Sequence, residues 1–290
     1  MREIWLACCL AVLVGGSAVA ADMSAEGWAE VILKETDGGA PIPLLSGYVP
    51  RLDEKLAYAI QGALVDAQAR ERGVGGYKAA FTSPASRERF GMDGPASGVL
   101  FADGARSGDG VGINLTDFHQ LMLETEIGFI LRSAITRQMR SVDDLKTYVR
   151  AAVPVIELPD LNFADPANLR GLDIVATNIA AASYLVGPPL RIYDLEKVNA
   201  IEVVLERDDA EIDRGAARNA GGDQLETLLW LVNHLQALGQ PLEEGYLLIT
   251  GALGKVNPGL PGRYSAHYGD LWTMRFQVLD GRADKAGGSP

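Results

Sequence analysis

Cysteine and basic residues are scarce in this sequence of 290 residues. The two cysteines, Cys8 and Cys9, both lie within the first twenty residues. If that segment is removed, the chain has no thiol, which excludes disulfides, thiolate zinc sites and a cysteine nucleophile. Lys and Arg number 26 against 38 Asp and Glu, so the formal net charge is −12. An acidic chain without a basic stripe repels polyanions, which argues against nucleic acid or an anionic membrane surface as a partner.

Several common catalytic motifs are missing as well. The sequence has no G-x-S-x-G nucleophile elbow, no phosphate-binding loop and no helix with paired histidines. The glycines of 73–76 follow a predicted helix rather than a strand, which argues against dinucleotide binding. The three histidines, His119, His234 and His267, are far apart in the sequence. We interpret each as a structural residue rather than a zinc ligand or general base.

The N-terminal segment has the pattern of a secretory signal. Arg2 precedes an apolar stretch over 4–16, and Ala18-Val19-Ala20 forms an A-x-A cleavage site. The pattern predicts a signal peptide over residues 1–20 and a periplasmic protein that is free of the membrane after cleavage. An uncleaved membrane anchor is the alternative interpretation.

The rest of the chain is predicted to be one domain, with a helical segment over 21–75 followed by a catalytic part over 76–290. Apolar residues every four positions between 52 and 64 predict one helix, which ends at the glycine cluster near 75. A second helix is expected from Ser141, capped by the S-x-x-D pattern and continuing to Pro154. A third is expected from Asp223 to Gly239.

Between these helices lie short β-branched or alternating runs bounded by Gly, Pro and Asp. The predicted strands are Gly98–Ala102, Val111–Leu115, Glu124–Leu131, Val153–Leu158, Ala200–Glu206, Tyr246–Thr250 and Leu271–Leu279. Helices and strands are partly segregated along the chain rather than strictly alternating. This order favours an α+β fold with a large mixed sheet and flanking helices over a doubly wound parallel fold.

The most informative cluster of polar residues is acidic. In the predicted strand that begins at Glu124, alternation places Glu124 and Glu126 on one face and the apolar residues on the other. A third carboxylate, Glu157, ends another apolar run. Three oxygen donors without His or Cys favour Mg²⁺ or Mn²⁺ over zinc. Taken alone, the pattern also fits two solvated acids on an exposed sheet edge.

Several segments, in their order and spacing, resemble one known family over residues 45 to 280. They are Gly76-Tyr77-Lys78 with Thr82-Ser83, Gly98 to Phe101, Glu124 to Phe129, Ile156 to Asp160, Asp173 with Asn178, Leu229 to Leu235, and Gly239 to Gly251. The chain resembles the 2-oxopent-4-enoate hydratase group of the fumarylacetoacetate hydrolase superfamily. The resemblance implies that superfamily's fold and assembly into a homo-oligomer, for which the apolar segment 228–238 is a candidate interface.

The resemblance also implies a metal-dependent hydratase, a hydro-lyase acting on a small 2-hydroxy-2,4-dienoate or 2-oxo-4-enoate. Glu124, Glu126 and Glu157 would hold Mg²⁺ or Mn²⁺, and Lys78 would be the catalytic lysine. The residues that would contact substrate are Ser83, Asn178, Thr250 and Gly251. Decarboxylation or C–C hydrolysis on the same scaffold, or non-catalytic binding of a 2-oxo acid, remain as alternatives.

The chain departs from the family pattern at one position that matters for chemistry. Hydratases of the group have a Pro-Asp-Tyr-Gly segment where this chain reads Pro95-Ala96-Ser97-Gly98, so the acid expected to work with Lys78 is absent. Asp93 and Asp103 are candidate substitutes if a loop brings either one close. The predicted export signal is a second departure.

Overall fold

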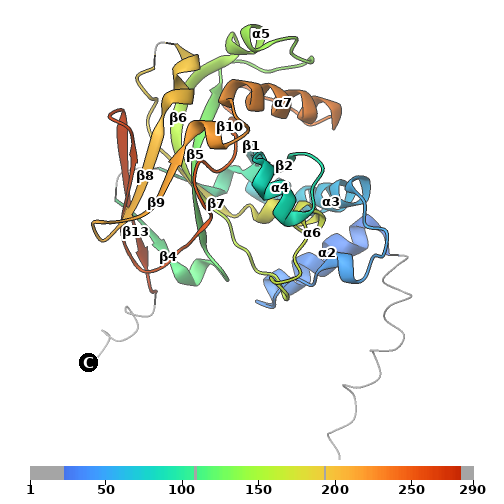
Figure 1. Cartoon of the computed structure of the whole chain (residues 1–290). Coiled ribbons are helices and arrows are strands. Elements are labelled where there is room, and N and C mark those ends of the chain that lie inside the picture. Colours follow the sequence, from blue (N-terminus) through green and yellow to red (C-terminus); the bar gives the residue numbers. More distant parts are fainter. Residues whose placement is uncertain (1–22, 108–109, 193, 282–290) are drawn as a thin grey trace, which may run out of the picture.

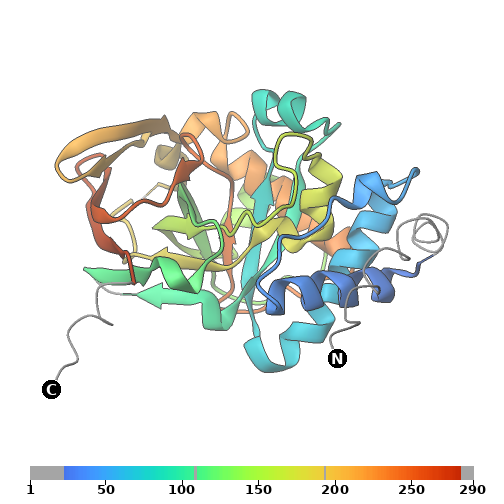
Figure 2. The ribbon, with the colours of Figure 1, turned by 90° about the horizontal axis from the view of Figure 1, so that it is seen from below.

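The computed structural model describes residues 23–107, 110–192 and 194–281. Two β-sheets form the body of the protein, and helices pack around the larger sheet (Figure 1). The smaller sheet lies at one end of the molecule, whereas helices α2 and α3 lie at the other end (Figures 1 and 2). The helices are α2 (Ala25–Asp37), α3 (Glu54–Arg72), α4 (Pro84–Phe90), α5 (Val142–Lys146), α6 (Gly171–Ala176) and α7 (Gln224–Ala237).

The larger sheet is mixed and has eight strands. Its strand order is β2 (Ala96–Phe101), β1 (Val74–Ala80), β10 (Leu247–Ile249), β5 (Met122–Leu131), β6 (Val149–Leu158), β7 (Ser183–Val186) and β3 (Ala105–Ser107), with β11 (Asn257–Pro258) also pairing with β5. β1 runs parallel to β10, whereas β5 is antiparallel to both of its neighbours, β10 and β6. The α+β class with a large mixed sheet is therefore as predicted.

The smaller sheet has five strands and packs beside the larger one. Its order is β4 (Val111–Asn114), β13 (Trp272–Leu279), β12 (Gly262–Tyr268), β8 (Glu202–Arg207) and β9 (Ala210–Ala216). The hydroxyl of Tyr268 donates a hydrogen bond of 2.5 Å to the carbonyl oxygen of Val155 in β6. This contact joins the two sheets beside the residues that form the candidate site.

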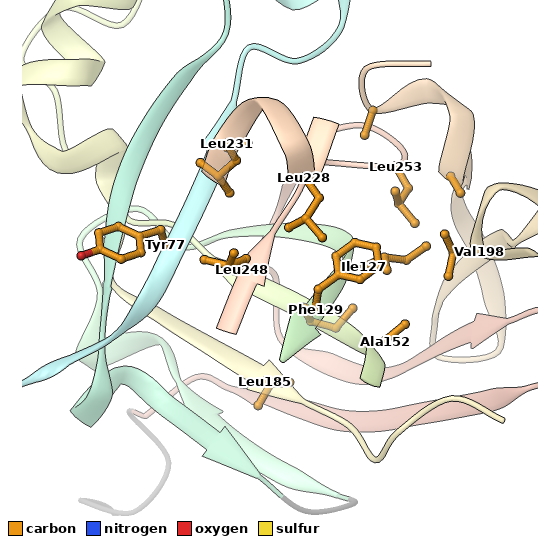
Figure 3. Close-up of a cluster of buried hydrophobic side chains, with 14 of the residues drawn as sticks. Tyr77, Ile127, Phe129, Ala152, Leu185, Val198, Leu228, Leu231, Leu248 and Leu253 are labelled. Atoms are coloured by element: carbon orange, nitrogen blue, oxygen red, sulfur yellow. The ribbon is translucent and has the colours of Figure 1, made fainter. Parts of the chain in front are cut away.

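One face of the larger sheet is covered by α7. Leu228 and Leu231 of this helix share a buried cluster with Ile127 and Phe129 of β5 and Leu248 of β10 (Figure 3). Burial of such side chains contributes about 1.5–3 kcal/mol each to folding. The buried side of α7 is thus used within the chain, and the interface expected of 228–238 is left with its partly exposed residues Leu229, Trp230 and Leu238.

The predicted helix after Ser141 is much shorter than expected. The Ser141 hydroxyl caps it as predicted, accepting from the Asp144 amide at 3.2 Å, but the helix ends at Lys146. Val149 instead starts β6 and pairs with Leu131, so a strand contains Pro154. Pairing of β6 with β7 starts only at Val155, so Pro154 lies beyond the end of that ladder, where a missing N–H is tolerated.

Several elements were missed because their sequence patterns are weak. β1 begins with Val74-Gly75-Gly76, and β9 carries charged residues on its exposed face. Helix α2 was also not predicted individually, although its segment was expected to be helical. Among the described residues, no helix has the length and apolarity needed to cross a membrane. The predicted signal peptide over 1–20, with its cysteines, lies outside the described residues.

Candidate active site

The register of the β5–β6 hairpin brings the three predicted carboxylates together. Glu124 lies directly opposite Glu157, and Glu126 follows two residues later on the same face of the sheet. One carboxylate oxygen from each residue lies within 4.8 Å of the others. Glu126 and Glu157 are fully buried, while Glu124 is half-buried. The exposed-edge interpretation of these acids therefore does not fit the structure.

Lys78 of β1 extends toward the same cluster. Its side chain is buried, and its Nζ contacts Glu157 Oε1 and donates to the carbonyl oxygen of Ile179 at 3.2 Å. The short strand β10, which lies between β1 and β5, ends at Ile249 opposite Gly128. Glu124 and Glu126 therefore extend beyond its end, which leaves room for the lysine to reach Glu157.

Burial and mutual repulsion perturb the carboxyl groups. Burial, followed by the charge of Glu157, raises the pKa of Glu124 to about 7. Burial, followed by the charges of Glu157 and Glu124, raises the pKa of Glu126 well above its usual range. For Lys78, burial acts to lower the pKa, but the negative charges of the three glutamates outweigh it and the pKa is raised. The lysine is thus charged, whereas Glu124 and Glu126 retain protons more readily than ordinary glutamates do.

Two carboxylate oxygens of the cluster lack partners. Glu126 Oε2 accepts a hydrogen bond of 2.9 Å from the Gly251 amide, but Glu126 Oε1 and Glu157 Oε2 are buried without any hydrogen bond among the described residues. Unpaired buried carboxylate oxygens are costly. A cation placed between the three acids would satisfy them, and when all four groups are ionised the net charge of the glutamates and Lys78 is −2. The donor set fits a divalent, oxygen-preferring ion.

The backbone at Gly251 requires glycine. Its φ is +105°, and a Cβ there would lie 2.4 Å from Thr82 Oγ1. This close approach lets the Gly251 amide reach Glu126. The side chain of Thr250 is buried and contacts Gln224 Oε1 and the carbonyl oxygen of Ile127. Of this predicted pair, Gly251 lines the cavity described below, whereas Thr250 does not.

The carbonyl that contacts Lys78 belongs to a left-handed turn. Asn178, Ile179 and Ala180 have φ values of 56°, 52° and 52°. Each left-handed residue without glycine costs roughly 1–2 kcal/mol. The side chain of Asn178 stabilises the turn, since its Oδ1 accepts from the Val99 amide at 2.7 Å and its Nδ2 donates to the Val99 carbonyl at 2.9 Å. Asn178 makes one accepted and one donated bond in this backbone pairing and does not line the cavity described below, so its predicted substrate contact stays a prediction.

A cavity of about 180 Å³ opens beside Lys78 and Glu124. Apart from these two residues, its walls are mostly apolar. They include Phe81, Phe90, Leu161, Leu169, Ile174 and Ile179. Ser83 also lines the cavity, and its hydroxyl donates to Ser86 Oγ at 3.0 Å while accepting from the Ser86 amide at the start of α4. The arrangement is a charged, metal-compatible end joined to an apolar chamber.

The two candidate substitutes for the missing acid do not reach this cavity. Asp93 is exposed in the turn before β2, and Asp103 pairs with Arg72 at 3.0 Å on another part of the surface. Neither lines the cavity that contains Lys78, which corrects the expectation that a loop brings one of them close. Ala96 itself pairs with Ala80, which does line the cavity.

The histidines lie outside the carboxylate cluster, in keeping with the structural roles expected of them. His234 stacks on Trp230 at 4.8 Å between ring centroids, and its Nε2 lies 3.0 Å from the Tyr58 hydroxyl. His119 lies 3.0 Å from Asp160, and His267 lies 3.2 Å from a glutamate.

Comparison with known proteins identifies the family. No protein-family model matches the sequence. A 2-keto-4-pentenoate hydratase from Burkholderia vietnamiensis is 34% identical over 241 residues, covering 82% of this chain and 90% of the relative. 2-Keto-4-pentenoate hydratase 1 from Dechloromonas aromatica is 32% identical over 234 residues, covering 80% and 88%. The chain belongs to the 2-keto-4-pentenoate hydratase family. A 4-oxalocrotonate decarboxylase from Pseudomonas putida is also similar, at 26% identity over 77% of this chain and 81% of the relative.

Solved structures show that this hydratase-family chain has the predicted fold of the fumarylacetoacetate hydrolase superfamily. 4-Oxalocrotonate decarboxylase from Pseudomonas putida G7, complexed with magnesium and adipate, has a TM-score of 0.80 at 21% identity, covering 88% of this chain and 97% of that one. Fumarylpyruvate hydrolase from Pseudomonas aeruginosa, in complex with Mn²⁺ and pyruvate, has a TM-score of 0.56 at 16% identity, covering 70% and 88%.

Two features of the site were not predicted for this hydratase-family chain. One is the Ile179 carbonyl oxygen, which contacts Lys78. The other is Phe81, which lines the cavity in a left-handed conformation with φ of 55°. A backbone carbonyl carries no sequence signal, and an aromatic residue at positive φ contradicts local preference. Sequence patterns therefore offer no means of finding either one.

Proposed function

We propose that the protein is a metal-dependent hydratase that converts a 2-hydroxy-2,4-dienoate, through its 2-oxo-4-enoate tautomer, into the 4-hydroxy-2-oxo acid. The observation that carries the proposal is the convergence of Glu124, Glu126, Glu157 and Lys78 at one end of a cavity. The names of the curated relatives support the reaction, and their matches extend over most of the chain.

The proposed cofactor is Mg²⁺ or Mn²⁺ held by the three glutamates. Hard oxygen donors, a net negative cluster and the two unpaired carboxylate oxygens all favour such an ion. When bound, the ion supplies Lewis-acid stabilisation of the negative charge that develops on the C2 oxygen as the dienol ketonises.

The chain's own residues would orient the substrate and move its protons. The Lys78 ammonium is fixed by Glu157 and by the Ile179 carbonyl oxygen, so its remaining hydrogen is available for the cavity. From there it can donate a hydrogen bond to developing negative charge or transfer a proton. The apolar walls formed by Phe81, Leu169 and their neighbours would exclude bulk water from the rest of the substrate.

The test of this proposal is a direct assay. Purified protein with Mg²⁺ should consume 2-hydroxypenta-2,4-dienoate, seen as loss of the dienol absorbance, and form 4-hydroxy-2-oxopentanoate. Release of carbon dioxide from a dicarboxylate substrate would instead identify a decarboxylase, and cleavage of a diketone acid a C–C hydrolase. Binding of a 2-oxo acid without any turnover would identify a non-catalytic binding protein.

The affinity for the ion should rise with pH. Glu124, with a pKa of about 7, and Glu126, whose pKa is raised well above its usual range, must both lose their protons when an ion binds. Mg²⁺ or Mn²⁺ should therefore bind more tightly at pH 8 than at pH 6 and release protons. Calorimetry in two buffers of different ionisation enthalpy measures both effects, and a pH-independent affinity would contradict the site.

The same pKa shifts predict the pH dependence of the metal-free protein. Because both folded-state pKa values are raised, these groups contribute stability that is fully present below their ordinary pKa of 4.5. The contribution of Glu124 is lost as the pH rises through about 7, and that of Glu126 is lost as the pH rises through its own raised pKa. The Tm of metal-free protein should fall over this range, and added Mg²⁺ should restore it.

We also propose that the protein is exported to the periplasm. The support is the signal-like pattern of residues 1–20 in the sequence. Protein purified from the periplasmic fraction should begin near Ala21 and show no free thiol, because Cys8 and Cys9 leave with the signal. Mass spectrometry and a thiol reagent measure this, and a label on either cysteine in the mature protein would contradict it.

Assembly into a homo-oligomer is proposed as well. Exposed apolar side chains such as Leu260, Trp272 and Leu279 support it, since they lie on the surface of the single chain. Light scattering of the purified protein tests the proposal, and the mass of a monomer would refute it.

A further inference from the structure

Beyond the metal-compatible end, the described residues of the cavity walls include no cationic side chain that could pair with a second carboxylate of a substrate. Lys78 and Glu124 are the only charged side chains that line it within the described parts of the chain, and both belong to the metal-compatible end. Beyond them the lining is formed by Phe81, Phe90, Leu161, Leu169, Ile174 and Val256, together with small or hydroxyl-bearing residues.

The apolar wall is built from segments that are far apart in the sequence. Phe81 directly follows β1, Phe90 ends α4, Leu169 precedes α6, and Val256 precedes β11. The rings of Phe81 and Phe90 pack edge to face with centroids 5.6 Å apart. Phe81 is held in a left-handed conformation that aromatic residues rarely adopt. The apolar lining is therefore formed jointly by four separate segments and is not the side of a single helix.

The guanidinium that lies close by in the sequence is already engaged. Arg87 Nη1 donates to the carbonyl oxygens of Phe81 at 3.0 Å and Thr82 at 2.9 Å. The hydroxyls of Ser83 and Ser86 bond within their own turn. A carboxylate placed among these walls would lose its hydration without gaining a cation, which is strongly unfavourable.

We propose that this chain selects substrates whose end remote from the 2-oxo acid group carries an apolar substituent, such as a short alkyl group, and rejects those that end in a second carboxylate. The inference rests on the proposed hydratase function, because that function orients the substrate with its 2-oxo acid end at the glutamates and Lys78. The apolar chamber beyond Lys78 then receives the other end of the molecule.

The experiment uses two substrates that differ only in their terminal group, with the mature protein and Mg²⁺. 2-Hydroxyhexa-2,4-dienoate ends in a methyl group, 2-hydroxyhexa-2,4-dienedioate ends in a carboxylate, and 2-hydroxypenta-2,4-dienoate is the reference. The methyl-terminated substrate should exceed the reference in kcat/KM by about tenfold, as one methyl group does in an apolar pocket. The dicarboxylate should be at least about 100-fold poorer than the methyl-terminated substrate.

A pair of variants tests the wall itself. Leu169→Arg introduces a cation at the half-buried lining position and should raise kcat/KM for the dicarboxylate while lowering it for the methyl-terminated substrate. Leu238→Arg makes the same change at an exposed leucine on another surface and should leave the ratio of the two substrates unchanged. If Leu169→Arg does not fold, Leu169→Ala should still reduce the preference for the methyl group.

The possible outcomes separate the inference from the function. Turnover of the reference with equal or better turnover of the dicarboxylate would overturn the inference and leave the hydratase function intact. If none of the dienoates reacts, the hydratase proposal is wrong, and the pocket is tested by binding of saturated analogues in the presence of Mg²⁺. Then 2-oxohexanoate should bind more tightly than 2-oxohexanedioate, and equal affinity or no binding of either would overturn the inference.

Discussion

Glu126→Gln is expected to abolish tight binding of the divalent ion and to lower metal-dependent turnover by at least about 10³-fold, because the ion's charge stabilisation is worth several kcal/mol. The metal-free variant should nevertheless be at least as stable as the wild type at pH 8. Glu126 is fully buried beside two other acids, and its raised pKa means that ionisation opposes folding. Glutamine keeps an oxygen for the Gly251 amide and removes the charge.

The neighbouring variant Glu157→Gln should behave differently. Glu157 contacts the buried ammonium of Lys78, so its neutralisation leaves a buried charge without its partner. Breaking a buried pair in this way typically costs about 3–5 kcal/mol. Calorimetry with Mn²⁺ and thermal unfolding with and without metal measure both variants. The matched control is Glu211→Gln, which alters an exposed acid that forms an ion pair with Arg214.

Two results would contradict this account of the site. Unchanged Mn²⁺ affinity in Glu126→Gln would show that the three glutamates do not form the metal site. A metal-free Glu126→Gln protein that is clearly less stable than the wild type at pH 8 would show that the ionised carboxylate stabilises the metal-free fold, contrary to this account.

The parts of the site that depend on strand periodicity could be predicted from the sequence. Alternation alone places Glu124 and Glu126 on one face, and the structure has this arrangement. The third acid, Glu157, is opposite Glu124 only because β5 and β6 form one hairpin with that register. Periodicity within a strand does not fix the register between strands, so the resemblance to the family was needed to include it.

The parts that depend on tertiary contacts could not be predicted. The Ser141 cap and the spacing of the apolar residues after it suggested a helix to Pro154, but 149–158 pairs with β5 as a strand. Asn178 was expected to contact substrate, yet its amide group completes the hydrogen bonds of Val99. In both cases the partner is far away in the sequence, and local patterns contain no information about it.

Lys78→Met is expected to lower the rate of dienoate hydration by about 10²–10⁴-fold, the usual value of one positioned acid or base. Methionine fills the space of the lysine stem in the buried site without its charge. The divalent ion should bind at least as tightly as in the wild type, because loss of the ammonium frees Glu157 Oε1 and removes a positive charge. Reduced turnover with retained Mn²⁺ affinity would assign Lys78 to proton transfer. Loss of both would assign it to the architecture of the metal site.

Position 96 carries alanine rather than an acid, so the next experiment introduces a carboxyl group there. Ala96 pairs with Ala80, two residues from Lys78, so both alanines lie on the lysine's face of the sheet. Ala96→Asp would place a carboxyl group on that face and should raise the rate of hydration, whereas Ala96→Asn, of the same size, should not. Both substitutions bury a polar group in a fully buried position, so both should lower Tm.

Comparison of these two variants separates chemistry from packing. A gain in Ala96→Asp alone would show that proton transfer limits the wild type and that Lys78 acts without a carboxyl partner. If the wild type is already as fast as ordinary hydratases, no carboxyl group at position 96 is needed. Since Asp93 and Asp103 lie outside the cavity, the remaining candidate donors are Lys78, the hydroxyl groups that line the cavity and bound water. If the wild type and Ala96→Asp are both inert while Mg²⁺ and oxalate still bind, the site binds the metal and a carboxylate ligand but catalyses no reaction. The protein is then a binding module for 2-oxo acids.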